Sequence, residues 1–205
     1  MQNRHQFSIK ENTDKILCSV CVATYRRMEL LEKLLKSLVN QDLTDNIVLE
    51  IIVIDNDKDK SALSIINKFQ NSSRIRFHYF NQPIKNISIT RNKTIEKASG
   101  DYLLFIDDDE IASRRWVYYL LDTLKKYDAD GVFGELRPEF NSQTPSWMRR
   151  RDLFYSPAQL TGEKVKFTYT GNCILKASLL KNMKEPFDIR YTVPGGEDTH
   201  LFSRL

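Results

Sequence analysis

Three consecutive carboxylates follow a short apolar run near the middle of the sequence. The run, Tyr102 to Ile106, reads YLLFI, and Asp107, Asp108 and Asp109 come directly after it. An unbroken apolar run of this length is typical of a strand that is buried on both faces of a parallel sheet. Because an unpaired buried charge is very costly, the three acids must meet water or a cation.

The spacing of these acids indicates what they could bind. Alternate side chains of an extended strand point the same way, so Asp107 and Asp109 lie on one side and Asp108 on the other. Two neighbouring carboxylates repel each other unless a hard divalent cation lies between or beside them. The stretch therefore predicts a metal site. The alternative is an acidic turn before a helix N-terminus, where carboxylates are favoured.

Other polar residues that could do chemistry also follow predicted strands. In an open α/β sheet, ligands bind outside the carboxyl ends of the strands, so residues that follow several strands are expected to share one site. These residues are Thr24 to Arg27, Asp55 to Asp57, Asn86 to Asn92 and Asp107 to Asp109.

These residue types suit a nucleotide that carries phosphates. Asp55 can accept hydrogen bonds from a base edge or ribose hydroxyls, and Arg27 and Arg91 can pair with phosphate. An Asx turn is the alternative for Asp55 to Asp57, and a solvated helix face is the alternative for Arg91. The sequence has no glycine-rich phosphate loop, so a diphosphate would be bound through metal rather than through backbone amides.

The elements that position these residues alternate between strands and helices, which predicts parallel β-α-β units with helices on both sheet faces. Strands are expected at 16–23, 49–54, 75–80 and 102–106, and helices at 28–41, 61–69, 86–98 and 114–127. Ser61 is expected to cap the second helix. Shorter strands at 132–136, 165–169 and 174–176 and a helix from 197 onward complete the chain.

Composition and charge limit the class of protein. The chain has 205 residues, of which 41% are hydrophobic, and this is enough for one domain with a sizeable core. Its net charge of +4 suits an anionic small molecule or surface and is too small to predict nucleic-acid binding. The first 15 residues do not resemble a signal peptide, and no run reaches the roughly 18 apolar residues of a membrane span. The expected location is the cytoplasm.

The three cysteines, Cys18, Cys21 and Cys173, argue against a disulfide framework and are typical of a reducing compartment. Cys18 and Cys21 have C-x-x-C spacing, but both fall within the apolar run Ile16 to Ala23. Residues three apart in a strand point to opposite faces. We therefore predict that both are core residues rather than a redox or zinc pair.

Six stretches occur in an order that matches a known family: VCVATYRR, LEIIVIDND, NISITRN, GDYLLFIDDDE, TGN and GGED. Through them, residues 16 to 201 resemble the catalytic domain of an inverting family 2 glycosyltransferase with the GT-A fold. The chain departs from the family pattern in two ways. Arg26 stands where many members carry Asn, and the chain stops about one helical turn beyond GGED.

The resemblance implies a single α/β GT-A domain. Its central sheet would be Rossmann-like and mostly parallel, with helices on both faces and a small secondary antiparallel sheet. A polar extension, 1–15, would precede the domain, 16–205. Within it, 16–110 would be the nucleotide-binding half and 111–205 the acceptor half, truncated at its C-terminus.

The resemblance also implies roles for matching residues. Asp109, together with Asp107, would be a ligand of Mn²⁺ or Mg²⁺, and Asp198 would be the general base. Nucleotide contacts would come from Thr24, Tyr25, Arg27, Asp55, Asn86, Arg91, Asp107 and Asp108. The pocket for the donor sugar and acceptor would be lined by Thr170, Gly171, Asn172, Gly196 and Glu197.

Asp198 also has a physical case of its own. Gly195 and Gly196 let the backbone turn sharply and let a substrate approach closely. A carboxylate at the start of the following helix can take a proton from an acceptor hydroxyl within hydrogen-bond reach. The alternative is that Asp198 is an N-cap residue.

The resemblance thus implies metal-dependent transfer of a sugar from a nucleotide-diphosphate sugar, commonly a UDP-sugar, to an acceptor hydroxyl. The acceptor would be a saccharide or a lipid-linked molecule in bacterial surface polysaccharide or glycolipid synthesis. Two rival functions stay open. The early C-terminus suits a catalytically silent sugar-nucleotide-binding module, whereas a sugar-phosphate nucleotidyltransferase would need the missing glycine-rich loop.

One further segment has a composition that suits a surface contact. Trp147 to Arg151 places two apolar residues beside three arginines. Such a segment can bind an anionic acceptor or the inner face of the membrane, where each basic residue adds about 1 kcal/mol. A solvated irregular loop is the alternative.

Overall fold

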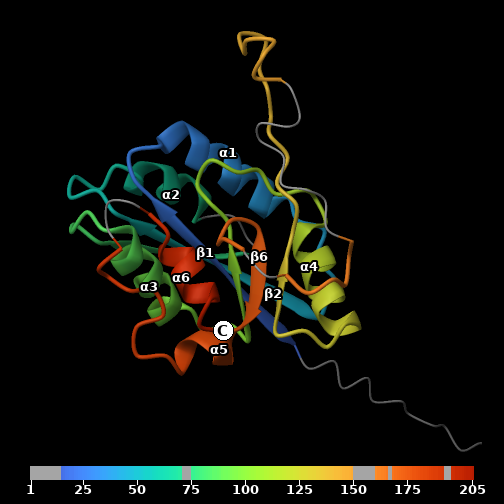
Figure 1. Ribbon diagram of the computed structural model, residues 1–205. Coiled ribbons are helices and arrows are strands. Elements are labelled where there is room, and N and C mark those ends of the chain that lie inside the picture. Colours follow the sequence, from blue (N-terminus) through green and yellow to red (C-terminus); the bar gives the residue numbers. More distant parts are fainter. Residues whose placement is uncertain (1–14, 71–74, 150–159, 166–167, 192–194) are drawn as a thin grey trace, which may run out of the picture.

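The computed structural model describes residues 15–70, 75–149, 160–165, 168–191 and 195–205 (Figure 1). These residues form a six-stranded sheet with the order β3-β2-β1-β4-β6-β5. Four strands are mutually parallel: β1 (Ile16–Thr24), β2 (Ile47–Asp55), β3 (Arg76–Asn81) and β4 (Tyr102–Phe105). β6 (Cys173–Lys176) is antiparallel to β4, and β5 (Gly131–Phe133) is antiparallel to β6.

The antiparallel part is present, and within the described residues it continues the central sheet instead of forming a second one. The reason is that β6 pairs with β4 along its whole length, from Tyr102 opposite Lys176 to Phe105 opposite Cys173. The fold class predicted from the sequence is otherwise confirmed as an α/β domain built on a mostly parallel sheet.

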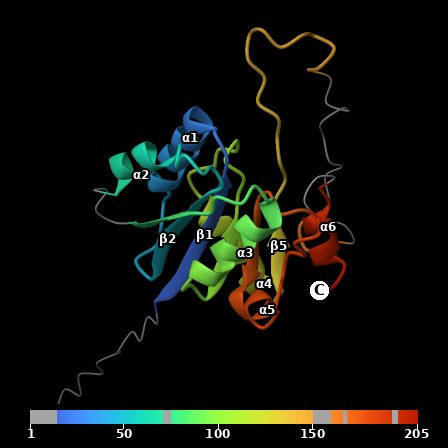
Figure 2. The same ribbon diagram turned by 90° about the vertical axis from the view of Figure 1, so that its left-hand side faces the viewer.

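Helices cover both faces of the sheet. α1 (Met28–Val39), α2 (Leu63–Phe69) and α4 (Trp116–Lys126) pack on one face. α3 (Ile87–Lys97), α5 (Ala177–Lys181) and α6 (Glu197–Phe202) pack on the other, where Figure 2 shows α3 and α5 next to each other. The strands are buried from both sides, which explains their apolar sequences.

The two layers separate Cys18 from Cys21, as expected for residues three apart in a strand. Cys18 lies in the core beneath α1 and α4, and Cys21 lies in the core beneath α3. Both thiols are buried and free. Burial raises the pKa of each to about 12, so neither provides a thiolate at neutral pH.

The register of the parallel strands brings their carboxyl ends level. Thr24 pairs with Asp55, and Asp55 pairs with Asn81. β4 pairs with β1 only as far as Phe105 opposite Cys21. Beyond this pair β4 and β1 are joined by side chains, as in the hydrogen bond from Thr24 to Asp108.

Three local predictions differ from the structure. α2 begins at Leu63 with Ala62 at its N-cap position, so Ser61 does not cap it. β5 ends at Phe133 rather than at residue 136. Its partner strand begins only at Cys173, since Asn172 has a φ of 52° and is not extended, although its carbonyl still accepts from Gly134 N–H at 2.8 Å. The strand expected at 165–169 lies partly outside the described residues, and the rest of it is not in a strand.

A charged residue is buried within β2. Glu50 is 3% exposed and accepts hydrogen bonds from the hydroxyl of Ser19 and from the backbone N–H and hydroxyl of Ser99. Burial raises the pKa of Glu50, but these hydrogen bonds, together with the imidazole of His78 3.4 Å away, outweigh it and hold the pKa below its usual value. The ionised carboxylate thus joins β2, β1 and the turn before β4.

Glu50→Gln is expected to lower the free energy of unfolding at neutral pH by about 1.5–3 kcal/mol, the usual contribution of hydrogen bonds to a charged group. Because the folded-state pKa is depressed, this contribution is complete above the unfolded-state pKa of about 4.3. It is lost as the pH falls through the folded-state pKa. Urea denaturation from pH 7 down to the lowest pH at which the protein stays folded measures the effect.

Glu29→Gln, which changes an exposed residue of α1, is the matched control. The gap in stability between wild type and Glu50→Gln should narrow as the pH falls. A gap that does not depend on pH would contradict a stabilising role for the ionised carboxylate.

Candidate functional site

A cavity of about 410 Å³ lies at the carboxyl ends of β1 and β4 beside the N-terminal part of α3. It brings together most of the residues predicted to contact a nucleotide. Its lining consists of Ala23, Thr24, Tyr25, Arg27, Asn56, Ile87, Thr90, Arg91, Asp107, Asp108 and Asp109.

Asp108 fastens the end of β4 to the end of β1. Its side chain is buried, and its two oxygens accept hydrogen bonds from Thr24 Oγ1 at 2.7 Å and from Arg27 Nη1 at 3.0 Å. Burial raises the pKa of Asp108, against the opposing effect of these two donors. Both carboxylate oxygens of Asp108 thus have partners within the protein.

Asp107 and Asp109 lie at the mouth of the cavity, with side chains 44% and 45% exposed. Each pairs with one arginine. Asp109 Oδ2 lies 2.7 Å from Arg27 Nη1, and Asp107 Oδ1 lies 3.1 Å from Arg91 Nη2. The protein therefore balances the exposed acids with its own guanidinium groups.

These two acids are the residues that could hold a divalent cation. Within the described ranges, no group of three or more His, Cys, Asp or Glu side chains encloses a metal position. Mg²⁺ is usually bound by one or two carboxylates together with waters and substrate phosphates rather than by an all-protein cage. Two half-exposed carboxylates at a cavity mouth provide such a partial set of oxygen ligands.

Arg91 connects three elements. It is 8% exposed, and its guanidinium lies 5.7 Å from the centre of the Phe187 ring. One nitrogen pairs with Asp107 after β4, and the other donates to the carboxylate of Glu197 at the start of α6. A solvated helix face, the alternative for Arg91, is therefore not what the structure shows.

The stretch NISITRN holds the chain that leads to α6. Asn86 caps α3 by accepting from Ile89 N–H at 3.1 Å, and it donates to the carbonyl of Ile189 at 3.0 Å. Ser88 donates to the carbonyl of Tyr191 at 3.2 Å.

Asn92, the last residue of the same stretch, exchanges two hydrogen bonds with the backbone of Phe187, at 2.7 and 2.9 Å. The sequence prediction missed this role. The residue type gave a partial signal, since an Asn side chain can both donate and accept and can therefore bind a backbone N–H and C=O together.

Asp55 is enclosed by the protein rather than exposed in the cavity. It is 0% exposed, and its oxygens accept from Asp57 N–H at 3.0 Å, Ala62 N–H at 2.8 Å and Tyr79 Oη at 3.0 Å. The bond to Asp57 is the Asx turn that the sequence left as an alternative. Asn56 lines the cavity next to it. Asp55 therefore has no exposed carboxylate with which to make the contact to a nucleotide base that the sequence had predicted.

Tyr25 presents an aromatic ring at the cavity wall. Lys85 Nζ lies 4.8 Å and the Arg26 guanidinium 5.4 Å from the ring centre. Arg26 has a φ of 55° and pairs with Asp57 at 3.1 Å and Asp59 at 3.0 Å. Arg26 stands where many family members carry Asn. Its ion pairs join the turn after β1 to the turn after β2.

A second cavity, of about 910 Å³, shares Asp109 with the first and lies toward α4 and β5. Trp116, Tyr119 and Asn172 are among its lining residues. Trp116 Nε1 donates to Asn172 Oδ1 at 2.7 Å. Of the residues predicted for the sugar and acceptor pocket, Asn172 lies here.

Glu110, which the sequence prediction left without a role, also lines the second cavity. Burial and the charges of Asp107 and Asp109 raise the pKa of Glu110 to about 8. Gly171 packs against it, since a Cβ at that position would lie 2.6 Å from Glu110 Oε1. Thr170, the residue before Gly171, is also buried, and its hydroxyl has no partner among the described residues.

Asp198 lies in the first turn of α6. Gly196 occupies the N-cap position, so Asp198 is not the capping residue. The carboxylate accepts from Thr199 N–H at 2.7 Å. Asp198 does not line the two cavities around Asp109, and α6 is connected to them through Glu197 and Arg91.

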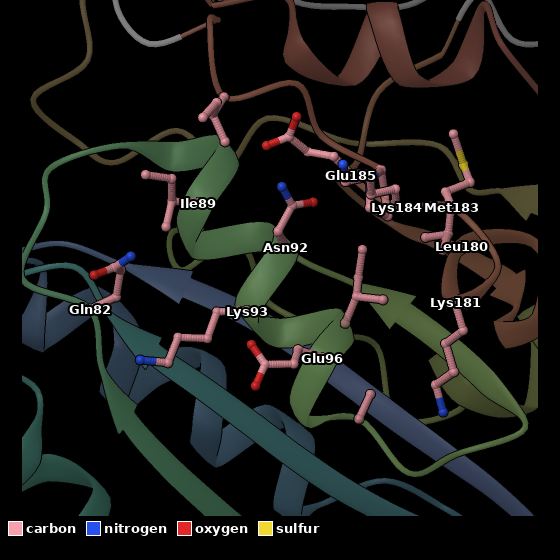
Figure 3. Close-up of a pocket in the computed structure, with 14 residues that line it drawn as sticks. Gln82, Ile89, Asn92, Lys93, Glu96, Leu180, Lys181, Met183, Lys184 and Glu185 are labelled. Carbon is pink, nitrogen blue, oxygen red and sulfur yellow. The ribbon is translucent and has the colours of Figure 1, made fainter.

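A third cavity, of about 810 Å³, lies on the other side of α3 (Figure 3). Lys93 and Glu96 line it from α3, and Lys181 lines it from α5. Figure 3 shows Asn92 pointing toward the loop that carries Glu185. Helix α3 lies between this cavity and the acids Asp107, Asp108 and Asp109.

The segment from Gly134 to Arg149 projects away from the sheet in both views (Figures 1 and 2). Trp147 is 60% exposed there. Arg149 donates to the carbonyls of Asn141 and Thr144, each at 3.0 Å, and so closes the turn. Arg150 and Arg151 lie outside the described residues. In the part of the chain that the structure covers, no helix is long and apolar enough to cross a membrane.

Solved structures share this fold. TarS 1–349 of S. aureus in complex with UDP superposes with a TM-score of 0.69 at 20% identity, covering 91% of this chain and 54% of that one. Mannosyltransferase PcManGT from Pyrobaculum calidifontis, in complex with GDP-Man and Mn²⁺, gives 0.70 at 16% identity, covering 93% and 52%. The domain has the GT-A fold.

Sequence comparison defines the family. The model of Glycosyl transferase family 2 matches residues 19–184, and the chain belongs to this family. Succinoglycan biosynthesis protein ExoM of Rhizobium meliloti is 35% identical over 185 residues, which are 90% of this chain and 59% of ExoM. Poly(ribitol-phosphate) beta-glucosyltransferase of Bacillus spizizenii is 27% identical over 176 residues, 82% of this chain and 26% of that protein. The chain thus spans little more than half of ExoM and less of the second relative.

Proposed function

We propose that this domain transfers a sugar from a nucleotide-diphosphate sugar to a hydroxyl of a saccharide or lipid-linked acceptor, with inversion at the anomeric carbon. The reaction would serve bacterial surface polysaccharide or glycolipid synthesis. The observation that carries the proposal is the cavity at the ends of β1 and β4, where Tyr25, two arginines and two half-exposed acids meet. Its support from relatives is family membership and neighbours solved with UDP and GDP-Man.

The nucleotide would lie along this cavity. The ring of Tyr25 offers a flat surface for a base, and Thr24 and Asn56 lie next to it. Arg27 and Arg91 carry the positive charge that a diphosphate requires. Because Asp55, Asn86 and Asp108 are buried and hydrogen-bonded within the protein, we assign them to shaping the cavity walls.

Asp109 and Asp107 would hold Mn²⁺ or Mg²⁺, which when bound supplies Lewis-acid neutralisation of the departing diphosphate. Arg27 contacts both Asp108 and Asp109. It can therefore release Asp109 and still be held by Asp108. Arg27 would then contact the diphosphate while its ion pair with Asp108 keeps the guanidinium in place.

Asp198 would act as the general base. Its carboxylate takes the proton of the acceptor hydroxyl, whose oxygen attacks the anomeric carbon from the face opposite the nucleotide. The bond to the diphosphate oxygen breaks, and the nucleoside diphosphate leaves. The donor sugar and acceptor would lie beside Asp109 on the side of the second cavity, near Thr170, Gly171 and Asn172.

A catalytically silent sugar-nucleotide-binding module is the second candidate. It is favoured by one observation, namely that Asp198 does not line the two cavities around Asp109. The two functions differ in turnover and not in binding, so one set of nucleotide-sugars separates them.

The donor is expected to raise the melting temperature of the protein in the presence of Mn²⁺, because ligand at 100 times its Kd stabilises the folded state by about 2.7 kcal/mol. A thermal-shift screen of nucleotide-sugars with and without Mn²⁺ identifies it, and release of nucleoside diphosphate with an acceptor measures turnover. Asp109→Asn should abolish the Mn²⁺-dependent part of the shift. No shift with any nucleotide-sugar would refute the proposed function.

Asp198→Asn is expected to lower transfer by about 10²–10⁴-fold, the usual contribution of a positioned general base, while nucleotide binding stays close to wild type. Asp122→Asn, at an exposed position on α4, is the matched control. Steady-state transfer and calorimetric titration with nucleoside diphosphate provide the two measurements. Wild-type turnover in Asp198→Asn would show that the base is another group.

We further propose that the segment around Trp147 contacts the membrane surface. Vesicles that contain anionic lipid should retain the wild-type protein at low ionic strength. Replacing Trp147 and the three arginines that follow Met148 should abolish retention, whereas Ile84→Ala, at a residue that is 62% exposed elsewhere, should not change it. Equal retention of all variants would contradict the proposal.

A further inference from the structure

The first turn of α6 has little support from its own backbone. Gly195 and Gly196 have φ values of 72° and 90°, and a Cβ at either position would meet nothing within 4 Å. Gly196 provides no side-chain cap, and α6 has only 6 residues. Since glycine leaves the chain free to adopt many directions, the entry to α6 must be fixed by side chains.

The two ends of α6 are held in different ways. At the far end Leu201 is 0% exposed, and the ring of Phe202 packs edge-on against Phe133 with centroids 5.0 Å apart. At the near end the carboxylate of Glu197, which is 6% exposed, is bound by Arg91, and one turn later the ring of His200 stacks on Tyr191 with centroids 4.8 Å apart. Among the described residues, the Glu197–Arg91 ion pair is the charged contact that joins the first turn of α6 to α3.

Arg91 carries a second carboxylate at the same time. Its other terminal nitrogen lies 3.1 Å from Asp107 Oδ1, at the end of β4. A guanidinium is a rigid planar fork, so it fixes the two carboxylates that it binds relative to each other. The first turn of α6 and the acids that follow β4 thus share one counter-ion.

We propose that Glu197 is a positioning residue which, through Arg91, holds Asp198 at the angle that it needs toward the acids at the end of β4. Successive residues of a helix point about 100° apart, so fixing Glu197 on Arg91 sets the direction of Asp198. This inference rests on the proposed function, because Asp198 is the base of that reaction. It gives Glu197 a task distinct from lining the sugar pocket.

Side chains of α3 also hold residues 187–191, which precede α6 in the sequence. Asn92, Asn86 and Ser88 bind the backbone of Phe187, Ile189 and Tyr191 in turn. Chain direction up to residue 191 is thereby set by neutral hydrogen bonds. Glu197 then adds an ion pair to these hydrogen bonds, beside the proposed donor site.

A distance measurement tests positioning without any substrate. Spin labels on Thr199→Cys of α6 and Lys33→Cys of α1, both exposed positions, report the placement of α6. The native cysteines are buried and will not take the label. Glu197→Gln should broaden the distance distribution, whereas Glu96→Gln, at a side chain that is 64% exposed, should leave it narrow.

Kinetics test whether placement matters for transfer. Glu197→Gln should lower kcat by about 100-fold, the loss expected for a misplacement of about 1 Å, while the Kd for nucleoside diphosphate and Mn²⁺ stays at the wild-type value. Glu197→Asp keeps the charge and shortens the side chain. It should therefore lower kcat by a smaller factor and also leave the Kd values unchanged. It also replaces Glu197→Gln if that variant does not fold.

The inference is overturned if Glu197→Gln keeps the narrow distance distribution. It is overturned equally if kcat and nucleotide affinity fall together, or if neither changes. A wild-type protein that transfers no sugar would instead refute the proposed function, and the label distances would still decide whether Glu197 positions α6.

Discussion

The structure depends on how acids at the end of buried strands are neutralised. Asp107, Asp108 and Asp109 leave an apolar sheet at one point, and their mutual repulsion would open the site if no cation were near. Arg27 and Arg91 supply the charge from two different elements, the turn after β1 and helix α3. Each arginine binds two acids, so the described residues form two clusters, Arg27 with Asp108 and Asp109, and Arg91 with Asp107 and Glu197. The Arg91–Glu197 pair is buried on both sides, whereas Arg27, Asp107 and Asp109 are half-exposed.

Helix α3 has an unusual position in this arrangement. It lies on the sheet, yet Ser88, Thr90, Arg91 and Thr94 are all buried. Thr90 and Thr94 donate to the carbonyls of Asn86 and Arg91 within the α3 region, whereas Ser88 donates to the carbonyl of Tyr191 and Arg91 pairs with the carboxylate of Glu197. The last two contacts bring α6 beside the acids after β4. A stretch predicted to contact the nucleotide thus also organises the opposite side of the site.

The sheet and its helices followed from apolar periodicity, since strands buried on both faces and helices with one apolar stripe have distinct patterns. The gathering of Thr24, Tyr25, Arg27 and Asp107 at one edge followed from the rule for parallel strands. Local hydrogen bonding was harder to foresee. Asp55 turned inward because three donors surround it.

The sequence by itself determined the α/β class, the edge of the sheet at which the acids gather and the membership of glycosyltransferase family 2, because these depend on residue types and spacings along the chain. Only the tertiary structure decided which acid each arginine binds, that Glu197 is buried on Arg91 and that Glu110 packs against Gly171. Those contacts join residues far apart in the sequence, 106 positions for Arg91 and Glu197. Their geometry depends on how the helices and turns pack and not on any local pattern.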